Sequence, residues 1–291
     1  MKAMILTAGS SGFQDYIQLT KPRITILVTA TTLVGFYLGA VEAISISLLV
    51  HTLFGTALVA AGAGALNMAF EWQADAGMRR TEKRPIPAGR LSPFQGVLFG
   101  LLLSLTGASY LWTLVNALTG ALSIITAILY LFAYTPLKKL TSLCTIVGAV
   151  PGAIPPMMGW TAVRNSLDFE AWWLFAILFL WQLPHFLSIA WLYREDYARG
   201  GFPMLPVVDE KGNQTSRQII IETIALLLVT LLPLGGLDLV YSVGALLLGL
   251  VFLYMGIRFS ITRSNLWARR LLLTSVVYLP CLMILMMLTK Q

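Results

Sequence analysis

Three oxygen-bearing side chains recur every four residues near the end of an apolar stretch: Asn67, Glu71 and Asp75. Because each four-residue step on an α-helix turns about 400°, they would form one stripe roughly 12 Å long. One amide oxygen and two carboxylates, with coordination positions left open, suit a Mg²⁺ ion that bridges to a phosphate. The spacing therefore predicts a metal-dependent site for a phosphorylated substrate.

A basic run follows the stripe and contains Arg79, Arg80, Lys83 and Arg84. Their N–H groups are suitable donors for phosphate oxygens. The competing interpretation is a solvated helix end held by an ion pair between Asp75 and Arg79. We favour the functional interpretation because the stripe begins inside an apolar stretch, where polar groups are costly and usually functional.

A second polar group lies around the end of the sixth apolar stretch. If the helix there runs on, His185 and Asp196 share a face, since 11 residues are close to three whole turns. Arg194 and Tyr197 supply further donors. An interhelical hydrogen bond remains the alternative role for His185.

The elements that position these groups must lie in a bilayer. Of the 291 residues, 57% are hydrophobic and 11% are charged, whereas a soluble domain carries about 25% charged residues. This composition excludes a water-facing fold and a nucleic-acid reader built on a basic surface. Cys144 and Cys281 lie in apolar runs, which favours neither a disulfide framework nor a zinc site. We therefore predict an all-α integral membrane protein.

Nine stretches are long and apolar enough to be transmembrane helices. The predicted spans are Ile24–Val41, Ile44–Leu66, Phe94–Leu114, Ala117–Tyr134, Leu143–Trp160, Trp172–Leu192, Ile219–Pro233, Leu237–Gly256 and Leu271–Leu288. They form a single polytopic domain over residues 1–291. Its two long connections, about 67–93 and 193–218, carry the polar groups described above.

The basic residues predict the orientation of these spans. With the N-terminus in the cytoplasm, 18 of the 20 Lys and Arg residues fall on the inner side, and only Arg164 and Lys290 fall outside. The positive-inside rule predicts such a split. We expect a bacterial inner-membrane protein with a cytoplasmic N-terminus, a periplasmic C-terminus and no cleavable signal.

The chain resembles the membrane prenyltransferases of the UbiA superfamily. The resemblance rests on NMAFEWQAD with MRRTEKRPIPAGRLSP, then YTPLKK, VGAVPGAIPPMMGW, and WQLPHF with REDYARGGFPMLPVV. It spans nearly the whole chain, and MxRT…RP, PGAIPP, LPHF and PMLPVV together favour the branch that prenylates haem. Two departures stand out: the family usually has Asp at the Glu71 position and often a further acid at the Gln73 position.

The resemblance implies a nine-helix bundle around a central cavity, whose substrates are farnesyl diphosphate and haem B. It places Asn67, Glu71 and Asp75 as catalytic residues and as ligands of a Mg²⁺ cofactor. The residues expected to bind the diphosphate are Arg79, Arg80, Lys83, Arg84, Arg194 and Lys138. The residues expected to contact haem are His185, Asp196 and Tyr197.

The resemblance also suggests partners downstream, namely haem A synthase or terminal oxidase assembly. Two other hypotheses remain open. One is a UbiA-type enzyme acting on a quinone or chlorin precursor; the other is a non-catalytic haem-binding or transport protein. A transporter places ionisable groups through the bilayer on several helices, whereas here they gather on one side, so transport ranks last.

Overall fold

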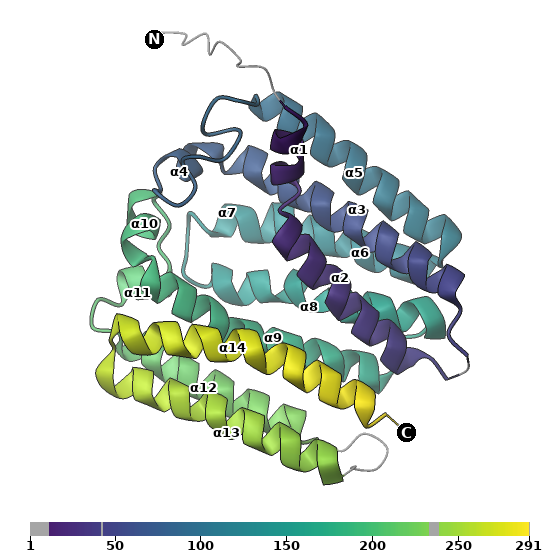
Figure 1. Cartoon of the computed structure of the whole chain (residues 1–291). Helices are drawn as coiled ribbons and strands as arrows, with labels where there is room; N and C mark the ends of the chain where they lie inside the picture. The colour runs from purple at the N-terminus through teal and green to yellow at the C-terminus, as the bar shows by residue number, and fades with distance from the viewer. Residues whose placement is uncertain (1–11, 42, 233–238, 291) are drawn as a thin grey trace.

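The computed structural model describes residues 12–41, 43–232 and 239–290, and all regular structure within them is helical (Figure 1). The predicted all-α class is confirmed. Nine long helical segments account for most of these residues. They are α2 (Pro22–Gly39), α3 (Ile46–Phe70), α5 (Pro93–Leu114), α6 (Ala117–Ile128) extended by η1 (Leu129–Tyr134) and α7 (Thr135–Leu137), α8 (Cys144–Arg164), α9 (Phe169–Leu192), α12 (Asn213–Thr230), α13 (Leu239–Thr262) and α14 (Asn265–Leu288).

Eight of these segments are long and apolar enough to cross a membrane, and α12 is not among them. This helix carries Arg217 and Glu222, yet it packs against α9 and α13 within the bundle. The count of nine spans therefore stays a prediction. Its seventh and eighth spans meet at residues 233–238, which lie outside the described residues, as do residues 1–11 and Gln291.

Local sequence explains where several helices begin. Ser92 and Gln95 form a capping box at the start of α5, and Pro93 occupies its first turn. The Asn116 side chain caps α6 by accepting a hydrogen bond from the Thr119 N–H at 2.8 Å. Such caps satisfy N–H groups that have no partner within the helix.

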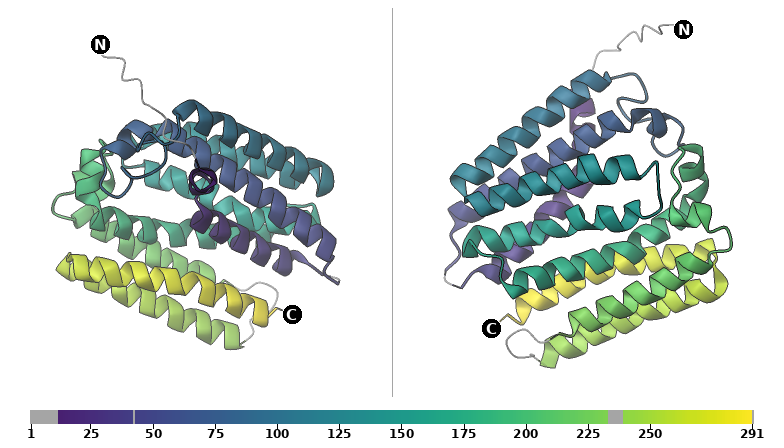
Figure 2. Two further views of the ribbon diagram at one scale, coloured as in Figure 1. Left: turned by 45° about the horizontal axis from the view of Figure 1, so that its top comes forward. Right: turned by 180° about the vertical axis from the view of Figure 1, so that it is seen from behind.

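The helices lie side by side in one bundle, as the two views of Figure 2 show. Helices α3 and α5 pack along each other, and α2 packs along α8. The α2–α8 approach requires glycine, because a Cβ at Gly35 would overlap the Pro156 carbonyl. Close backbone approach through small residues is typical of helix packing in membranes.

The two long connections lie at the same end of the bundle (Figure 1). One contains α4 (Trp72–Ala76); the other contains α10 (Arg194–Arg199) and α11 (Leu205–Val208). They touch where the Arg80 guanidinium lies over the Tyr197 ring, 4.3 Å from its centroid. The two connections therefore meet at one end of the bundle, as their shared polar character led us to expect.

The last helix ends at the opposite end of the bundle. Lys290 Nζ donates to the Tyr37 carbonyl at 2.6 Å, close to the end of α2. The start of α2 and the end of α14 therefore lie at opposite ends of the molecule (Figure 1).

Candidate active site

The predicted stripe lies at the junction of α3 and α4. The backbone breaks at Glu71, whose φ of −98° and ψ of 6° fall outside the helical region. The four-residue register nevertheless continues, because the Glu71 N–H donates to the Asn67 carbonyl at 3.0 Å and the Asp75 N–H donates to the Glu71 carbonyl at 2.9 Å. The three side chains thus come from two helical segments instead of one continuous helix.

Burial decides between the two interpretations of the stripe. Asn67 and Asp75 are 1% exposed and Glu71 is 3% exposed, so this is not a solvated helix end. Asp75 pairs with Arg84, whose Nη1 lies 2.6 Å from Oδ2, and not with Arg79. Helix α4 ends at Ala76, which takes Arg79 off the helical face that an i, i+4 pair needs.

Lys138 provides the cation for Glu71. Its Nζ lies 2.9 Å from Glu71 Oε1 and 3.0 Å from Oε2. The π-helical turn η1 precedes it, and Thr135 Oγ1 donates to the Tyr130 carbonyl within that turn at 2.9 Å. Single π-helical turns are frequent at functional sites. This turn brings Lys138 against a carboxylate that is 67 residues away in the chain.

Lys21 completes the cluster, and sequence reasoning did not assign it to the site. Its Nζ donates to Asn67 Oδ1 at 2.6 Å, while Asn67 Nδ2 donates to Thr135 Oγ1 at 3.0 Å. Burial and the nearby Arg84 cation lower the pKa of Lys21 to about 7. Its backbone is left-handed, with a φ of 48°, a conformation that costs a non-glycine residue of order 1–3 kcal/mol and occurs often at functional sites.

Each member of the stripe therefore faces its own cation. We call Asn67, Glu71 and Asp75 with Lys21, Arg84 and Lys138 the buried cluster. It holds three basic side chains and two carboxylates, and the N–H donors of the basic groups suit an anionic ligand. The one signal for Lys21 in the sequence was a Lys-Pro pair directly ahead of the first apolar stretch.

The cluster also fits a hard divalent cation. Within the described residues, no group of three or more His, Cys, Asp or Glu side chains could hold a metal ion. A divalent ion in the buried cluster would be coordinated by the two carboxylates and the Asn67 amide oxygen. Oxygen atoms of the substrate would fill the remaining coordination positions. Glu71 Oε1 is buried, and apart from the Lys138 ammonium it has no partner in the described part of the chain. This oxygen-only donor set matches the preference of Mg²⁺.

The second polar segment differs from its prediction in one respect. Helix α9 ends at Leu192, and Tyr193, with φ of −112° and ψ of 23°, separates it from α10. The expectation that His185 and Asp196 share the face of one continuous helix is therefore wrong. Asp196 is buried and forms an ion pair with Arg199 one turn along α10.

His185 makes an interhelical hydrogen bond, which was the structural alternative to a role in binding haem. Its Nδ1 lies 2.7 Å from Ser275 Oγ on α14. Its ring stacks on Trp181 with centroids 4.9 Å apart. These contacts hold the imidazole between α9 and α14, and no contact to the buried cluster is among them.

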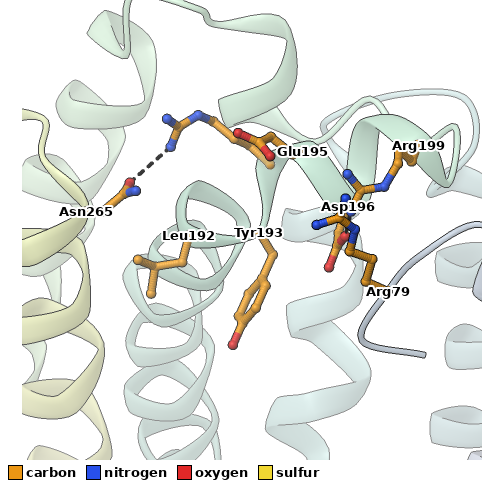
Figure 3. A pocket seen from close by; sticks show the side chains of 8 residues that line it. Arg79, Leu192, Tyr193, Glu195, Asp196, Arg199 and Asn265 are labelled. Atoms are coloured by element: carbon orange, nitrogen blue, oxygen red, sulfur yellow. Dashed lines mark hydrogen bonds and ion pairs between the residues drawn. The ribbon is translucent and has the colours of Figure 1, made fainter. Parts of the chain in front are cut away.

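The remaining residues predicted to bind substrate lie in different parts of the structure. The Arg80 guanidinium covers the Tyr193 and Tyr197 rings, and Lys83 is exposed. Arg79 and Arg194 line a separate polar pocket of about 320 Å³ (Figure 3). The full lining of this pocket is Arg79, Leu192, Tyr193, Arg194, Glu195, Asp196, Arg199 and Asn265.

Solved structures share this helical architecture. A structure of digeranylgeranylglyceryl phosphate synthase in membranes has a TM-score of 0.79 at 15% identity, covering 95% of this chain and 98% of that one. A UbiA homologue from Archaeoglobus fulgidus, bound to GPP and Mg²⁺, has a TM-score of 0.64 at 16% identity, covering 93% and 99%. At this identity the likeness establishes the fold.

The sequence establishes the family. The profile of the UbiA prenyltransferase family matches residues 28–279, and the chain belongs to this family. It is a multi-pass membrane protein.

Within the family, the chain groups with the protoheme IX farnesyltransferases. The protein of that name from Solibacter usitatus is 49% identical over 95% of this chain and 99% of its own length. The one from Koribacter versatilis is 45% identical over 97% and 94%.

Proposed function

We propose that the chain transfers the farnesyl group of farnesyl diphosphate to a vinyl group of haem B. Water adds to the cation that this transfer leaves, so that the reaction yields haem O, which carries a hydroxyethylfarnesyl group, and diphosphate. The observation that carries the mechanism is the buried cluster, in which three basic side chains surround two carboxylates and an amide at one end of a membrane-embedded bundle. The identity to the protoheme IX farnesyltransferases supports the choice of acceptor.

In this proposal the buried cluster binds the diphosphate end of the prenyl donor. Asn67, Glu71 and Asp75 would hold Mg²⁺, which supplies Lewis-acid stabilisation of the departing diphosphate. When these oxygens are engaged in that way, the cations that now pair with them become available to the diphosphate oxygens. Lys138 and Arg84 then bind the leaving group, and Lys21 contributes a third donor.

The electron count of the step is simple. The bond between the allylic carbon and the diphosphate oxygen breaks, and both electrons leave with diphosphate. The vinyl π electrons of haem B then form the new carbon–carbon bond. Water adds to the resulting cation and loses a proton. Burial matters here, because an apolar surrounding keeps water from the farnesyl cation before the vinyl group arrives.

We further propose that the cluster end of the bundle faces the cytoplasm, because the basic residues gather there. Cytoplasmic farnesyl diphosphate would reach the cluster directly, while the farnesyl chain and the macrocycle enter from the bilayer. The product would pass to haem A synthase or to terminal oxidase assembly. In this scheme His185 is a haem-contacting candidate, held in place by Ser275.

The test is a haem extract of a bacterial host that lacks haem O and expresses the chain. Chromatography and mass spectrometry of the extract should show haem O, and the Glu71→Gln variant should show haem B alone. If the extract contains prenylated quinone or chlorin precursors and no haem O, the proposed acceptor is wrong. If neither product forms in any extract, the enzymatic proposal fails.

A further inference from the structure

The turn between α13 and α14 carries a concentration of positive charge. Four arginines lie within about two helical turns of it. They are Arg258, Arg263, Arg269 and Arg270. Residues 239–290, which include both helices, contain no Asp or Glu. Arg263 Nη1 donates to the Lys211 carbonyl at 3.0 Å, and Figure 1 shows this turn near α11, at the end of the bundle that holds both long connections.

Two of these arginines lie against one aromatic ring. The Arg258 guanidinium, from α13, is 4.6 Å from the centroid of the Trp267 ring, and that of Arg270, from α14, is 4.5 Å from it. No other ring in the described part of the chain contacts two cations. Tyr254 packs edge-on against the same indole, with centroids 6.5 Å apart. Because two like charges beside one ring repel each other, an anion bound to both would stabilise the arrangement.

The N–H donors of this pair have no partner in the protein. Neither the Arg258 nor the Arg270 guanidinium forms an ion pair or a hydrogen bond among the described residues. Arg258 Nε is buried without a partner, which costs free energy. Stacking on an indole uses the face of a guanidinium and leaves the donors along its edge available, and these suit a phosphate. The pair therefore has donors for a group from outside the chain.

The lengths of the two helices place the pair at the depth of the lipid headgroups. Each helix has 24 residues, or about 36 Å, whereas the hydrocarbon core of a bilayer is about 30 Å thick. Arg258 precedes the end of α13 by four residues, and Arg270 follows the start of α14 by five. Long basic side chains at such positions extend to the interface. Tryptophan and tyrosine are also enriched there.

Apolar side chains continue from the pair along the outer surface of the hairpin. Val251 and Leu247 precede Arg258 by about two and three turns, so they share its face of α13. Leu273 and Val277 follow Arg270 on its side of α14. All four are exposed. Paired cations that continue into an exposed apolar face match a phosphate with acyl chains attached, and a soluble anion has nothing to place on that face.

We propose that Arg258 and Arg270, oriented by Trp267, bind the headgroup phosphate of an anionic phospholipid. Its acyl chains would lie along the outer face of α13 and α14, and its charge would balance a hairpin that has no acid in its described residues. This inference is independent of the proposed function, because it uses neither the buried cluster nor its substrates. A second copy of the chain is the other occupant that this face could take, and the experiment below detects it.

The experiment is native mass spectrometry of the purified full-length protein. The protein is titrated with phosphatidylglycerol and with phosphatidylcholine that has the same acyl chains, and the bound lipid is measured for each. One double variant is Arg258→Gln with Arg270→Gln. The matched control is Arg217→Gln with Arg269→Gln, which removes the same charge from two exposed arginines that contact no ring in the described part of the chain. Trp267→Leu removes the ring and keeps every arginine.

We expect the unmodified chain to bind phosphatidylglycerol at least about tenfold more tightly than phosphatidylcholine, the effect of one hydrogen bond to a charged group. The control should keep this ratio within about twofold. The Arg258 and Arg270 double variant should lose it, and Trp267→Leu should lower it by about threefold, since the ring orients both guanidiniums. The ratio is taken within each variant because a misfolded protein would lose both lipids; if the glutamine pair does not fold, Trp267→Leu decides the question.

Three results would overturn the inference. Equal loss of phosphatidylglycerol in the two double variants would show a diffuse charge effect and no site. Its complete displacement by an excess of inorganic phosphate would identify a site for a soluble anion. A dimer of the unmodified chain that holds no phosphatidylglycerol, and that the Arg258 and Arg270 double variant does not form, would assign this face to a second copy.

Discussion

The ion pair between Glu71 and Lys138 makes a quantitative prediction about stability and activity together. At 2.9 Å and an effective dielectric constant of about 20, the Coulomb attraction is about 6 kcal/mol. Desolvation offsets much of it, since the two side chains are only 4% and 14% exposed. Removing one partner leaves a buried charge alone, which destabilises a protein by about 3–5 kcal/mol.

We therefore expect Glu71→Gln and Lys138→Met each to lower the free energy of unfolding by about 3 kcal/mol, and the double variant to lose far less than the sum. Prenyl transfer should be abolished in all three, because both groups act on the donor. The measurements are unfolding in mixed detergent micelles and haem O formation in host extracts.

The control pair is Asp15 with Arg90, 2.8 Å apart, whose arginine is 39% exposed. Its coupling energy should stay below about 1 kcal/mol. Additive effects on stability at Glu71 and Lys138 would refute a buried ion pair. Near-normal prenyl transfer in their double variant would refute its role in the reaction.

Three further outcomes follow from the same geometry. Asp75→Asn should abolish farnesyl transfer while the protein still inserts and purifies, and transfer near the unmutated rate would remove Asp75 from the metal site. If His185 contacts haem, His185→Ala should shift the Soret band and reduce the amount of haem O. Ser275→Ala removes only the interhelical hydrogen bond and should lower the free energy of unfolding by about 1 kcal/mol. Equal Soret spectra for the two variants would show that the histidine has a structural role. Reporter fusions after Gln291 and within 193–218 should report opposite sides of the membrane, and a cytoplasmic signal from both would exclude nine spans.

The helices were predictable because hydrophobic length alone identifies them. The third span was predicted as Phe94–Leu114 and the helix is Pro93–Leu114. The differences occur where a helix extends beyond its apolar part. Helix α9 begins at Phe169, three residues ahead of its predicted start, because the N-cap residue Asp168 and Glu170 in the first turn fall outside the hydrophobic pattern.

The stripe itself was predictable, because a four-residue spacing is a local property. The cations that face the stripe were only partly predictable. Lys21 meets Asn67 across 46 residues, and Lys138 was expected near the diphosphate only through the family resemblance. The break at Tyr193 also escaped prediction, since no proline or glycine marks it and the helical pattern continues on both sides.

The measurement that tests the account most directly is a reconstituted reaction. Purified protein in nanodiscs is given farnesyl diphosphate and haem B, with Mg²⁺ or with a chelator, and both products are quantified. We expect haem O and diphosphate in equal amounts with Mg²⁺, and neither product with the chelator or in the Glu71→Gln variant. Haem O formed at the same rate by that variant would contradict the assignment of the buried cluster as the site where the prenyl donor is cleaved.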